Sequence, residues 1–521
     1  MAWSRRAPTA LLTAAVGALF LAPLGYLLVR NAGNDRLLEI IFSQRAVAPL
    51  ARTLALALAT ALIAGVLGTA GAWLITRTDL PARRVWGLLL ALPLVMPSFI
   101  AAFAFIAAFS PGGLMEEVLG TRGVSVSGFW GALAVLSLLT YPYVLLPVAA
   151  RLRQLPSALD ESARLLGKSP LDVFRGVVLP QAAPAILAGC LLVFLYVVGD
   201  FGAVVLLRVE TLTEGIFSNR LIDPEVSLAL SLLLAVVALS AAGGERRLSR
   251  SSGRDQIRDA SPAIVGLGRW LPAALAGLVA LIGLALVVPA AVLVYWASKG
   301  LGGQGGGRII DDPASLAGPA ISTSLVSIVA AVVAVAVVLP VAYHMAQRRD
   351  RLGGVANAAI VSGFALPGLV VALALVFWAL GSEVLVVFYQ TIPLLIAAYV
   401  LNFGALALGS ARVAVAGVPA RLDDAARALG SSRLRRFLRI DLPLMTPGLL
   451  AGAGLVLLSA MKELPATLLL APPGFSTLAT KIWGAAQEAI WADASLAALV
   501  LLAASSVLTW ALVLRRGGAL G

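Results

Sequence analysis

Charged residues are scarce in this 521-residue chain, where they make up 12% against the roughly 25% that is usual in soluble domains. Hydrophobic residues make up 60%, and the mean hydropathy is +0.96. The chain has one cysteine, Cys190, and one histidine, His344. An intrachain disulfide is therefore impossible, and a metal cage of histidine and cysteine cannot be assembled. We interpret both as packing residues and expect no metal site.

Apolar runs of about 20 residues recur along the whole length, and each is long enough to cross the hydrocarbon core of a bilayer as a helix. They predict an all-α integral membrane protein with about 12 transmembrane helices. The first run follows Arg5 and Arg6 and resembles a signal peptide, but it is as long as a full span and we expect it to be retained. The expected spans are 9–29, 50–75, 86–109, 129–150, 183–206, 226–244, 270–296, 319–346, 354–380, 390–411, 447–470 and 493–514.

The net charge of +13 would raise the question of nucleic acid in a soluble protein. Here most of the 39 Lys and Arg residues lie in the segments on one side of the predicted spans. This bias is typical of cytoplasmic segments, so it predicts membrane orientation and not nucleic-acid binding. We expect a multi-pass protein of the inner (plasma) membrane, in contact with lipid, with both termini in the cytoplasm.

The sequence repeats itself, which indicates a duplicated half. The stretch 160–167 aligns with 423–430 at a spacing of 263 residues, and upstream a spacing of 270 residues pairs Thr53 with Thr323. We predict a first half at 1–244, a cytoplasmic linker at 245–269 and a second half at 270–521, each half with six spans. The other matched positions are Leu179-Pro180 with Leu442-Pro443, Asp200 with Glu463, and Pro97 with Pro367.

Two long segments on the cytoplasmic side, here called the first motif loop (about 151–182) and the second motif loop (about 412–446), each predict two short helices. Gly167 and Gly430 are expected to end the first helix of each pair in a left-handed turn, and Ser169 can cap the next helix. Apolar residues recur at helical spacing, so a partner protein is expected to cover them. The alternative is that both loops lie on the membrane surface. These apolar residues are Leu159, Ala163, Leu166, Leu171, Phe174, Leu434 and Phe437.

Glu161-Ser162-Ala163 with Gly167 and Leu179-Pro180, and the matching second set, resemble the EAA loop of binding-protein-dependent ABC importer permeases. The sequence departs from that motif at Ser162 and Asp424. The resemblance implies two tandem six-helix halves of the type I fold, two copies of an ABC ATPase subunit docked on the loops, and an extracytoplasmic binding protein that delivers substrate. The residues expected to couple to the ATPase are Glu161, Ala163, Gly167, Leu171, Phe174, Pro180, Asp424, Ala426, Gly430, Leu434, Phe437 and Pro443.

A phosphate-binding loop is not predicted in this chain. Gly167-Lys168-Ser169 resembles the end of such a loop, but Ser162 stands where the loop needs glycine and no strand precedes it. We therefore expect no catalytic residues and no cofactor on this chain, with ATP and Mg²⁺ bound by the partner subunits. A secondary transporter is the competing class, although it would need midplane ionisable residues, which are nearly absent.

Intramembrane charges are costly and therefore diagnostic. Asp200 and Glu463 fall at matched positions near the outer ends of the fifth and eleventh spans, where they can line the substrate passage or lie at its wet mouth. Pro97 and Pro367 interrupt the third and ninth spans, as passage linings or as ordinary kinks. The stretches 199–207 and 461–470 resemble the fused ferric iron permeases. The fused permeases for thiamine and for aminoethylphosphonate share the layout, so they are the alternatives for substrate.

Overall fold

The computed structural model describes residues 7–109, 111, 113–120, 125–252, 264–302, 313–348, 350–419, 421, 422, 426, 428 and 430–509. Their regular structure is helical, apart from one isolated bridge between Thr78 and Val265. A helix satisfies its own backbone hydrogen bonds, which hydrocarbon cannot do. Within these residues, eleven helices are long and apolar enough to cross a membrane, and counting one sharply bent pair as a span gives twelve. The predicted all-α class with about twelve spans is confirmed.

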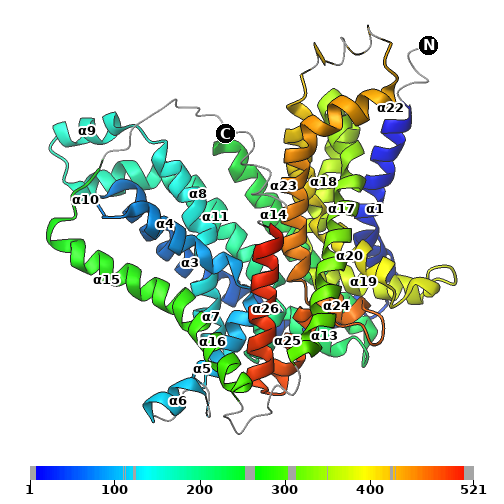
Figure 1. The fold of residues 1–521 in the computed structure, drawn as a ribbon, viewed down its shortest axis with the longest axis horizontal. Coiled ribbons are helices and arrows are strands. Elements are labelled where there is room, and N and C mark those ends of the chain that lie inside the picture. Colours follow the sequence, from blue (N-terminus) through cyan, green and yellow to red (C-terminus); the bar gives the residue numbers. More distant parts are fainter. Residues whose placement is uncertain are drawn as a thin grey trace. The chain divides into compact units, whose positions relative to one another are not determined.

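The chain forms two compact units, which are described separately (Figure 1). The first-half unit consists of residues 38–309 and 485–496. Its helices up to the end of the first motif loop are α2 (Leu37–Phe42), α3 (Gln44–Arg77), α4 (Arg83–Ala91), η1 (Leu92–Val95), α5 (Ser98–Phe109), α6 (Leu114–Leu119), α7 (Gly128–Thr140), α8 (Pro142–Arg153), α9 (Ser157–Leu165), α10 (Pro170–Val173) and the π-helical η2 (Phe174–Val178). It continues with α11 (Leu179–Gly199), α12 (Gly202–Leu206), α13 (Leu212–Asn219), α14 (Pro224–Ser252), η3 (Gly268–Trp270), α15 (Leu271–Ile282), the π-helical η4 (Gly283–Val287) and α16 (Val288–Leu301).

The second-half unit consists of residues 1–37, 310–484 and 497–521. It contains α1 (Ala7–Ala32), η5 (Pro313–Leu316), α17 (Ala317–Gln347), α18 (Arg351–Ala365), α19 (Gly368–Leu380), η6 (Val386–Phe388), α20 (Ile392–Ala416), α22 (Arg433–Arg436), the π-helical η7 (Phe437–Asp441), α23 (Leu442–Met461) and α24 (Pro465–Leu470). The last two helices, α25 (Leu478–Gln487) and α26 (Trp491–Thr509), each run across the division between the units.

The first helix of the chain packs in the second-half unit. Phe20 on α1 is fully buried, and its ring fills a hole lined by Gly363 and Gly404. A Cβ on Gly404 would lie 2.5 Å from the Phe20 ring, so only glycine leaves room for it. Tyr26 stacks on Trp378 with ring centroids 6.3 Å apart. The compact unit therefore gathers α1 with helices that lie more than 300 positions later in the chain.

The first helix of the second half, formed by α15 and α16, packs in the first-half unit. The indole Nε1 of Trp296 donates to the carbonyl of Ala107 on α5, at 3.3 Å. Lys299 forms an ion pair with Glu117 on α6. The division into compact units thus differs from the division into sequence halves, because each half's opening helix packs within the unit built mainly from the other half.

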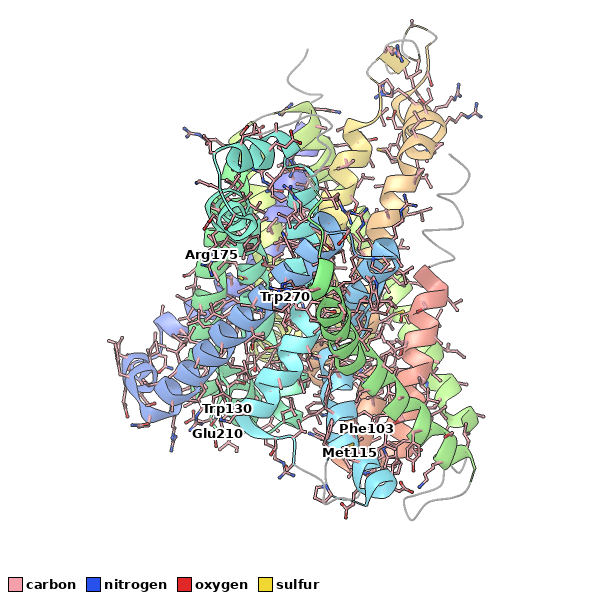
Figure 2. All side chains as sticks on the ribbon, turned by 90° about the vertical axis from the view of Figure 1, so that its left-hand side faces the viewer. Phe103, Met115, Trp130, Arg175, Glu210 and Trp270 are labelled. Atoms are coloured by element: carbon pink, nitrogen blue, oxygen red, sulfur yellow. The ribbon has the colours of Figure 1, made fainter. Side chains whose placement is uncertain are left out.

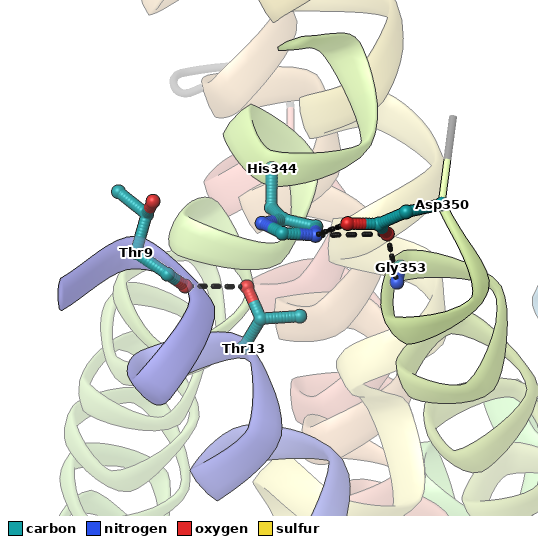
Figure 3. A network of polar contacts seen from close by, with 5 residues as sticks. All are labelled: Thr9, Thr13, His344, Asp350 and Gly353. Carbon is teal, nitrogen blue, oxygen red and sulfur yellow. Dashed lines mark hydrogen bonds and ion pairs between the residues drawn. The ribbon is translucent and has the colours of Figure 1, made fainter. Parts of the chain in front are cut away.

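A polar corner joins α17 to α18 in the second-half unit (Figure 3). His344 is buried, and its Nε2 lies 3.0 Å from both carboxylate oxygens of Asp350. Asp350 also caps α18 by accepting the N–H of Gly353 at 2.9 Å. These hydrogen bonds, the one from Gly353 first, hold the pKa of Asp350 below its usual range. His344 thus packs in the helix corner with a carboxylate as its hydrogen-bond partner.

Several predicted boundaries differ from the structure. The fifth and eleventh spans were expected to reach residues 206 and 470, but α11 ends at Gly199 and α23 at Met461. Helix α14 continues through Gly243 and Gly244 to Ser252, into the segment predicted as a linker. At the far end of that segment the N–H of Val265 donates to the carbonyl of Arg77, which fastens it to the end of α3.

Candidate functional site

The first motif loop ends its first helix, α9, at a left-handed glycine. Gly167 has φ of +78°, which glycine adopts without the penalty that a Cβ brings. The N–H of Lys168 donates to the carbonyl of Ala163 at 3.2 Å, as in a Schellman cap. A Cβ added at Gly167 would meet no atom within 4 Å. Glycine is therefore required for its backbone conformation and not for space.

The second motif loop has the same cap. Gly430 has φ of +71° and open space around it, and the N–H of Ser431 donates to the carbonyl of Ala426 at 3.0 Å. Each partner stands 263 positions after its counterpart in the first loop. The predicted left-handed turns are thus present at both glycines. Asp424 lies outside the described residues.

The second helix of each loop starts at a serine cap, and the two caps differ. In the first loop the Ser169 hydroxyl accepts the N–H of Asp172 at 3.3 Å, and the Asp172 carboxylate accepts the N–H of Ser169 at 3.3 Å and its hydroxyl at 2.6 Å. The Ser169 hydrogen bond lowers the pKa of Asp172. In the second loop the Ser432 hydroxyl accepts the N–H of Arg435 at 3.4 Å, and Arg435 stands where Asp172 does in the first loop. The first loop therefore has a reciprocal capping box and the second has a single bond.

The loops bury their alanines and expose leucines. Ala163 and Ala426 are buried, and α9 packs against α10 and η2 within the loop itself. Leu165 and Leu166 are 89% and 81% exposed, and Leu434 is 68% exposed. Each loop thus presents an apolar surface that its own chain leaves uncovered. Glu161 is exposed, whereas the side chains of Leu159 and Leu171 are not described.

An aromatic pair joins each motif loop to the longest helix of its own unit. Phe174 lies edge-on to Trp73 of α3, with ring centroids 5.9 Å apart. Phe437 lies against Tyr343 of α17 at 6.2 Å. The sequence reasoning took both phenylalanines as docking residues and did not single out their partners. Trp73 and Tyr343 are 270 positions apart, the same spacing that pairs Thr53 with Thr323. The sequence repeat could therefore have identified them as equivalent residues.

The Leu-Pro pair of each loop follows a π-helical turn. The N–H of Leu179 donates to the carbonyl of Phe174, five positions earlier, and Leu442 bonds to Phe437 in the same way. Pro180 and Pro443 directly follow these leucines. Since proline has no N–H, neither residue can donate a hydrogen bond to the preceding helical turn. Single π turns are rare and often lie at functional sites. Here they set the direction in which the motif loop meets α11 and α23.

The opposite end of the first-half unit holds Asp200, just after α11. Helix α11 begins after the motif loop and ends before Asp200, and Figure 2 labels Arg175 of that loop above Glu210. Asp200 is buried, and its Oδ1 accepts the N–H groups of Ala203 and Val204 at 3.0 and 3.3 Å. Ser98 adds a side-chain hydrogen bond. Asp200 therefore caps the short helix α12.

Glu463 has the matching place in the second-half unit, after α23. Its Oε1 accepts the N–H of Ala466 at 3.2 Å, at the start of α24. Its carbonyl accepts the hydroxyl of Thr467 at 2.8 Å, and Thr467 bonds to the hydroxyl of Tyr399 at 2.6 Å. Both sequence-predicted carboxylates thus lie at a break between two helices.

A threonine holds the next short helix in each unit. Thr53 on α3 accepts the N–H of Leu212 at 2.9 Å, and Thr323 on α17 accepts the N–H of Leu478 at 2.8 Å. Each threonine hydroxyl donates in turn to the carbonyl four positions earlier in its own helix, at 2.7 Å. The long helices α3 and α17 therefore each contact the motif loop through an aromatic residue and a short helix through a threonine.

The two predicted prolines lie at broken spans. Pro367 separates α18 from α19, which are bent by 103° relative to each other. Pro97 lies between η1 and α5. In each case the proline directly precedes the first residue of the following helix, where its missing N–H leaves no bond unmade. The interruptions predicted from sequence are therefore present at both prolines.

Comparisons with known proteins agree with this duplicated layout. The model of the family "binding-protein-dependent transport system inner membrane component" matches residues 69–252 and 338–516, which include both motif loops. The Fe(3+)-transport system permease protein FbpB 2 of Haemophilus influenzae is 28% identical over 508 residues, covering 95% of this chain and 96% of that protein.

Shorter relatives match only part of the chain. The sulfate transport system permease protein CysT of Salmonella typhimurium is 32% identical over 168 residues, which are 32% of this chain and 61% of that protein. The molybdenum transport system permease protein ModB of Mycobacterium bovis is 33% identical over 158 residues, which are 29% of this chain and 60% of that protein.

The family matches occur twice and cover more than half of the chain. The chain therefore belongs to the inner membrane components of binding-protein-dependent transport systems. It is an ABC importer permease subunit of the inner membrane, with two family domains in tandem.

Proposed function

We propose that this permease carries ferric iron. The observation behind the proposal is the relative named as an Fe(3+) permease, which aligns along 95% of this chain, whereas the sulfate and molybdenum relatives align with about a third of it. A fused two-half layout is thus shared over its whole length with an iron permease. The iron is cargo here, delivered by an extracytoplasmic binding protein.

Two copies of an ABC ATPase subunit bind the motif loops from the cytoplasm, one on each loop, and both termini of this chain lie on that side. ATP and Mg²⁺ bind to those subunits, and this chain contributes no catalytic residue. The exposed Leu165, Leu166 and Leu434 support this docking, because apolar anchors on short helices suit a groove on a partner surface.

Transport follows alternating access. ATP binding draws the two docked subunits together, and the aromatic pairs pass the movement of the loops to α3 and α17. Phe174 with Trp73 and Phe437 with Tyr343 are the contacts that support this step. Hydrolysis then resets the inward-open state. Two discrete arrangements of packed helices are the physical requirement for such a switch.

The test is uptake of labelled ferric ion into proteoliposomes that hold the permease with its ATPase and its loaded binding protein. We expect uptake that requires ATP and is not competed by thiamine, aminoethylphosphonate, sulfate or molybdate. Preferential uptake of one of those competitors would replace iron as the substrate. Uptake driven by an ion gradient, without nucleotide or ATPase, would instead support the secondary-transporter class.

A further inference from the structure

A short segment just before α15 lies against the corner between α3 and α4 in the first-half unit. This segment, residues 264–267, is here called the strap, and its Val265 forms a parallel bridge with Thr78. The N–H of Val265 donates to the carbonyl of Arg77 at 2.8 Å, and the carbonyl of Val265 accepts the N–H of Asp79 at 3.2 Å. Two backbone hydrogen bonds thus join the strap to the chain that leaves α3.

The side chain of Asp79 adds a third bond. Its Oδ1 accepts the N–H of Leu267 at 2.8 Å, and a Cβ at Gly266 would lie 3.6 Å from its Oδ2. Hydrogen bonds to a charged acceptor are stronger than those between neutral groups. Asp79 is exposed, so this carboxylate avoids the cost of burying a charge. Asp79 therefore fixes the strap at a second point, two residues beyond Val265.

The matching corner of the second-half unit, between α17 and α18, is held by its own side chains. His344 and Asp350 bond to each other there, and Asp350 caps α18. At the 270-residue spacing their places in the first half are taken by Leu74 and Leu80, which cannot make these bonds. Ala82, the residue before α4, has no side-chain oxygen with which to cap that helix. The strap therefore supplies bonds that the first-half corner cannot make with the equivalent side chains.

The strapped corner adjoins the contact between α3 and the first motif loop. Trp73 lies four positions before Arg77, which is about one turn of α3. Phe174 of the motif loop lies edge-on to Trp73. The last carbonyls of a helix have no partner within the helix, and the strap supplies one to Arg77. Without that bond the turn that carries Trp73 unwinds more readily.

We propose that Asp79 and the strap position the first motif loop, because they hold the last turn of α3 so that Trp73 receives the movement of Phe174. The segment that joins the two halves thus does more than connect them. The second-half unit meets the same need with His344 and Asp350. This inference rests on the proposed function, in which the motif loops pass the movement of the ATPase subunits to α3 and α17.

The first experiment uses the complete transporter with its ATPase and binding protein, and measures cargo moved per ATP hydrolysed. We expect Asp79→Ala and Val265→Pro each to lower this ratio about fivefold, because each removes a hydrogen bond that holds the strap. Asp79→Asn keeps a side-chain oxygen for the N–H of Leu267 and should keep most of the wild-type ratio. A contact that only stabilises the fold would reduce uptake and hydrolysis in proportion. An unchanged ratio in both Asp79→Ala and Val265→Pro would therefore overturn the proposal.

The second experiment closes the strap reversibly. Asp79→Cys and Gly266→Cys are combined in a Cys190→Ser background, so the chain has no other thiol. The short distance between the Gly266 Cβ position and the Asp79 carboxylate brings the two introduced thiols within range of a disulfide. Under dithiothreitol this variant should show the lowered ratio of Asp79→Ala, and oxidation should restore the ratio. A disulfide that fails to form, or that forms without raising the ratio, would overturn the proposal.

The disulfide also separates this inference from the proposed cargo. Its formation is measured as protection of the thiols from maleimide labelling, which requires no transport. Wild-type import of thiamine or sulfate in place of ferric ion would overturn the iron function, and the ratio would then be measured with that cargo. Transport without ATP would overturn the coupling on which the inference rests.

Discussion

The two halves of the chain agree closely at the motif loops and differ at the opposite end. Both loops end a helix at a left-handed glycine and rest an aromatic residue on a long helix. Both long helices hold a short helix through a threonine. At the broken spans, however, Ser98 bonds to the carboxylate of Asp200, whereas the matched Gly368 has no side chain and the carboxylate of Glu463 lies directly against it.

This difference separates two demands on a duplicated transporter. On the function proposed above, one ATPase subunit docks on each motif loop, so the loop geometry is needed in both halves. The proposed cargo does not bind two equal partners, so the helix breaks at Asp200 and Glu463 need not match. The four predictions that follow test how equal the repeated contacts are, from the largest expected effect to the smallest.

The largest effect is expected from Gly430→Val and Gly167→Val. A left-handed conformation costs a residue with a Cβ about 1–2 kcal/mol, and a β-branched side chain more. We expect iron uptake to fall about tenfold or more in each variant, while membrane insertion is retained. Uptake and the yield of the folded permease are measured together. Gly430→Asn is the matched control, because asparagine tolerates this conformation, and an equal loss in that control would contradict the conformational explanation.

The next effect concerns the aromatic pairs. Trp73→Ala and Phe174→Ala are expected to uncouple ATP hydrolysis from transport, with a coupling energy between them of about 0.5–1.5 kcal/mol. A double-mutant cycle measures this coupling energy from the ratio of uptake to ATP hydrolysis in the wild type, the two single variants and the double variant. The same cycle for Tyr343 and Phe437 should give a similar coupling energy. Additive effects in both cycles would show that the rings do not act as pairs.

A smaller effect is expected at the threonines. Thr53→Val and Thr323→Val keep the side-chain shape but leave the N–H of Leu212 or Leu478 without an acceptor, which costs about 1–3 kcal/mol. Thermal unfolding of the purified complex measures the loss of stability. Thr53→Ser keeps the hydroxyl and should retain most of the wild-type thermal stability. If the serine variant were as unstable as the valine variant, the hydrogen bond would not be the cause.

The smallest effect distinguishes the two loops. Ser169→Ala removes a reciprocal capping box and Ser432→Ala only a single bond, so we expect uptake to fall about twofold in the first and less in the second. Because the pKa of Asp172 is lowered in the folded protein, its contribution is present at neutral pH and is lost as pH falls through that pKa. Equal losses in the two variants would contradict the difference between the caps.

Much of the fold and of the motif loops could be predicted from the sequence. Hydrophobic length predicts spans because hydrocarbon leaves a helix as the main option for the backbone. Gly167 and Gly430 were identifiable because a left-handed turn selects for glycine. The sequence did not predict whether Phe174 and Phe437 contact a partner protein or another helix of the same chain. Helical spacing gives the face on which a ring lies but not whether its own chain or a partner covers it.

Asp200 and Glu463 show the same limit more sharply. The sequence identified them as a matched pair, and their equal position suggested an equal role. Their difference depends on Ser98 and Gly368, about a hundred positions earlier. Such long-range neighbours have no periodic signal in the chain.

The sequence alone determined the membrane class, the duplication and the turns of the motif loops, because hydrophobic length, repeat spacing and the backbone preference of glycine can be identified without knowing which segments pack together. Only the tertiary structure decided that α1 and α16 pack within units built mainly from the other half, and that Ser98 bonds to Asp200 whereas Gly368 lies against Glu463. Those outcomes depend on which surfaces fit, as Phe20 fits the hole at Gly363 and Gly404. Shape complementarity between distant segments is a property of the folded chain.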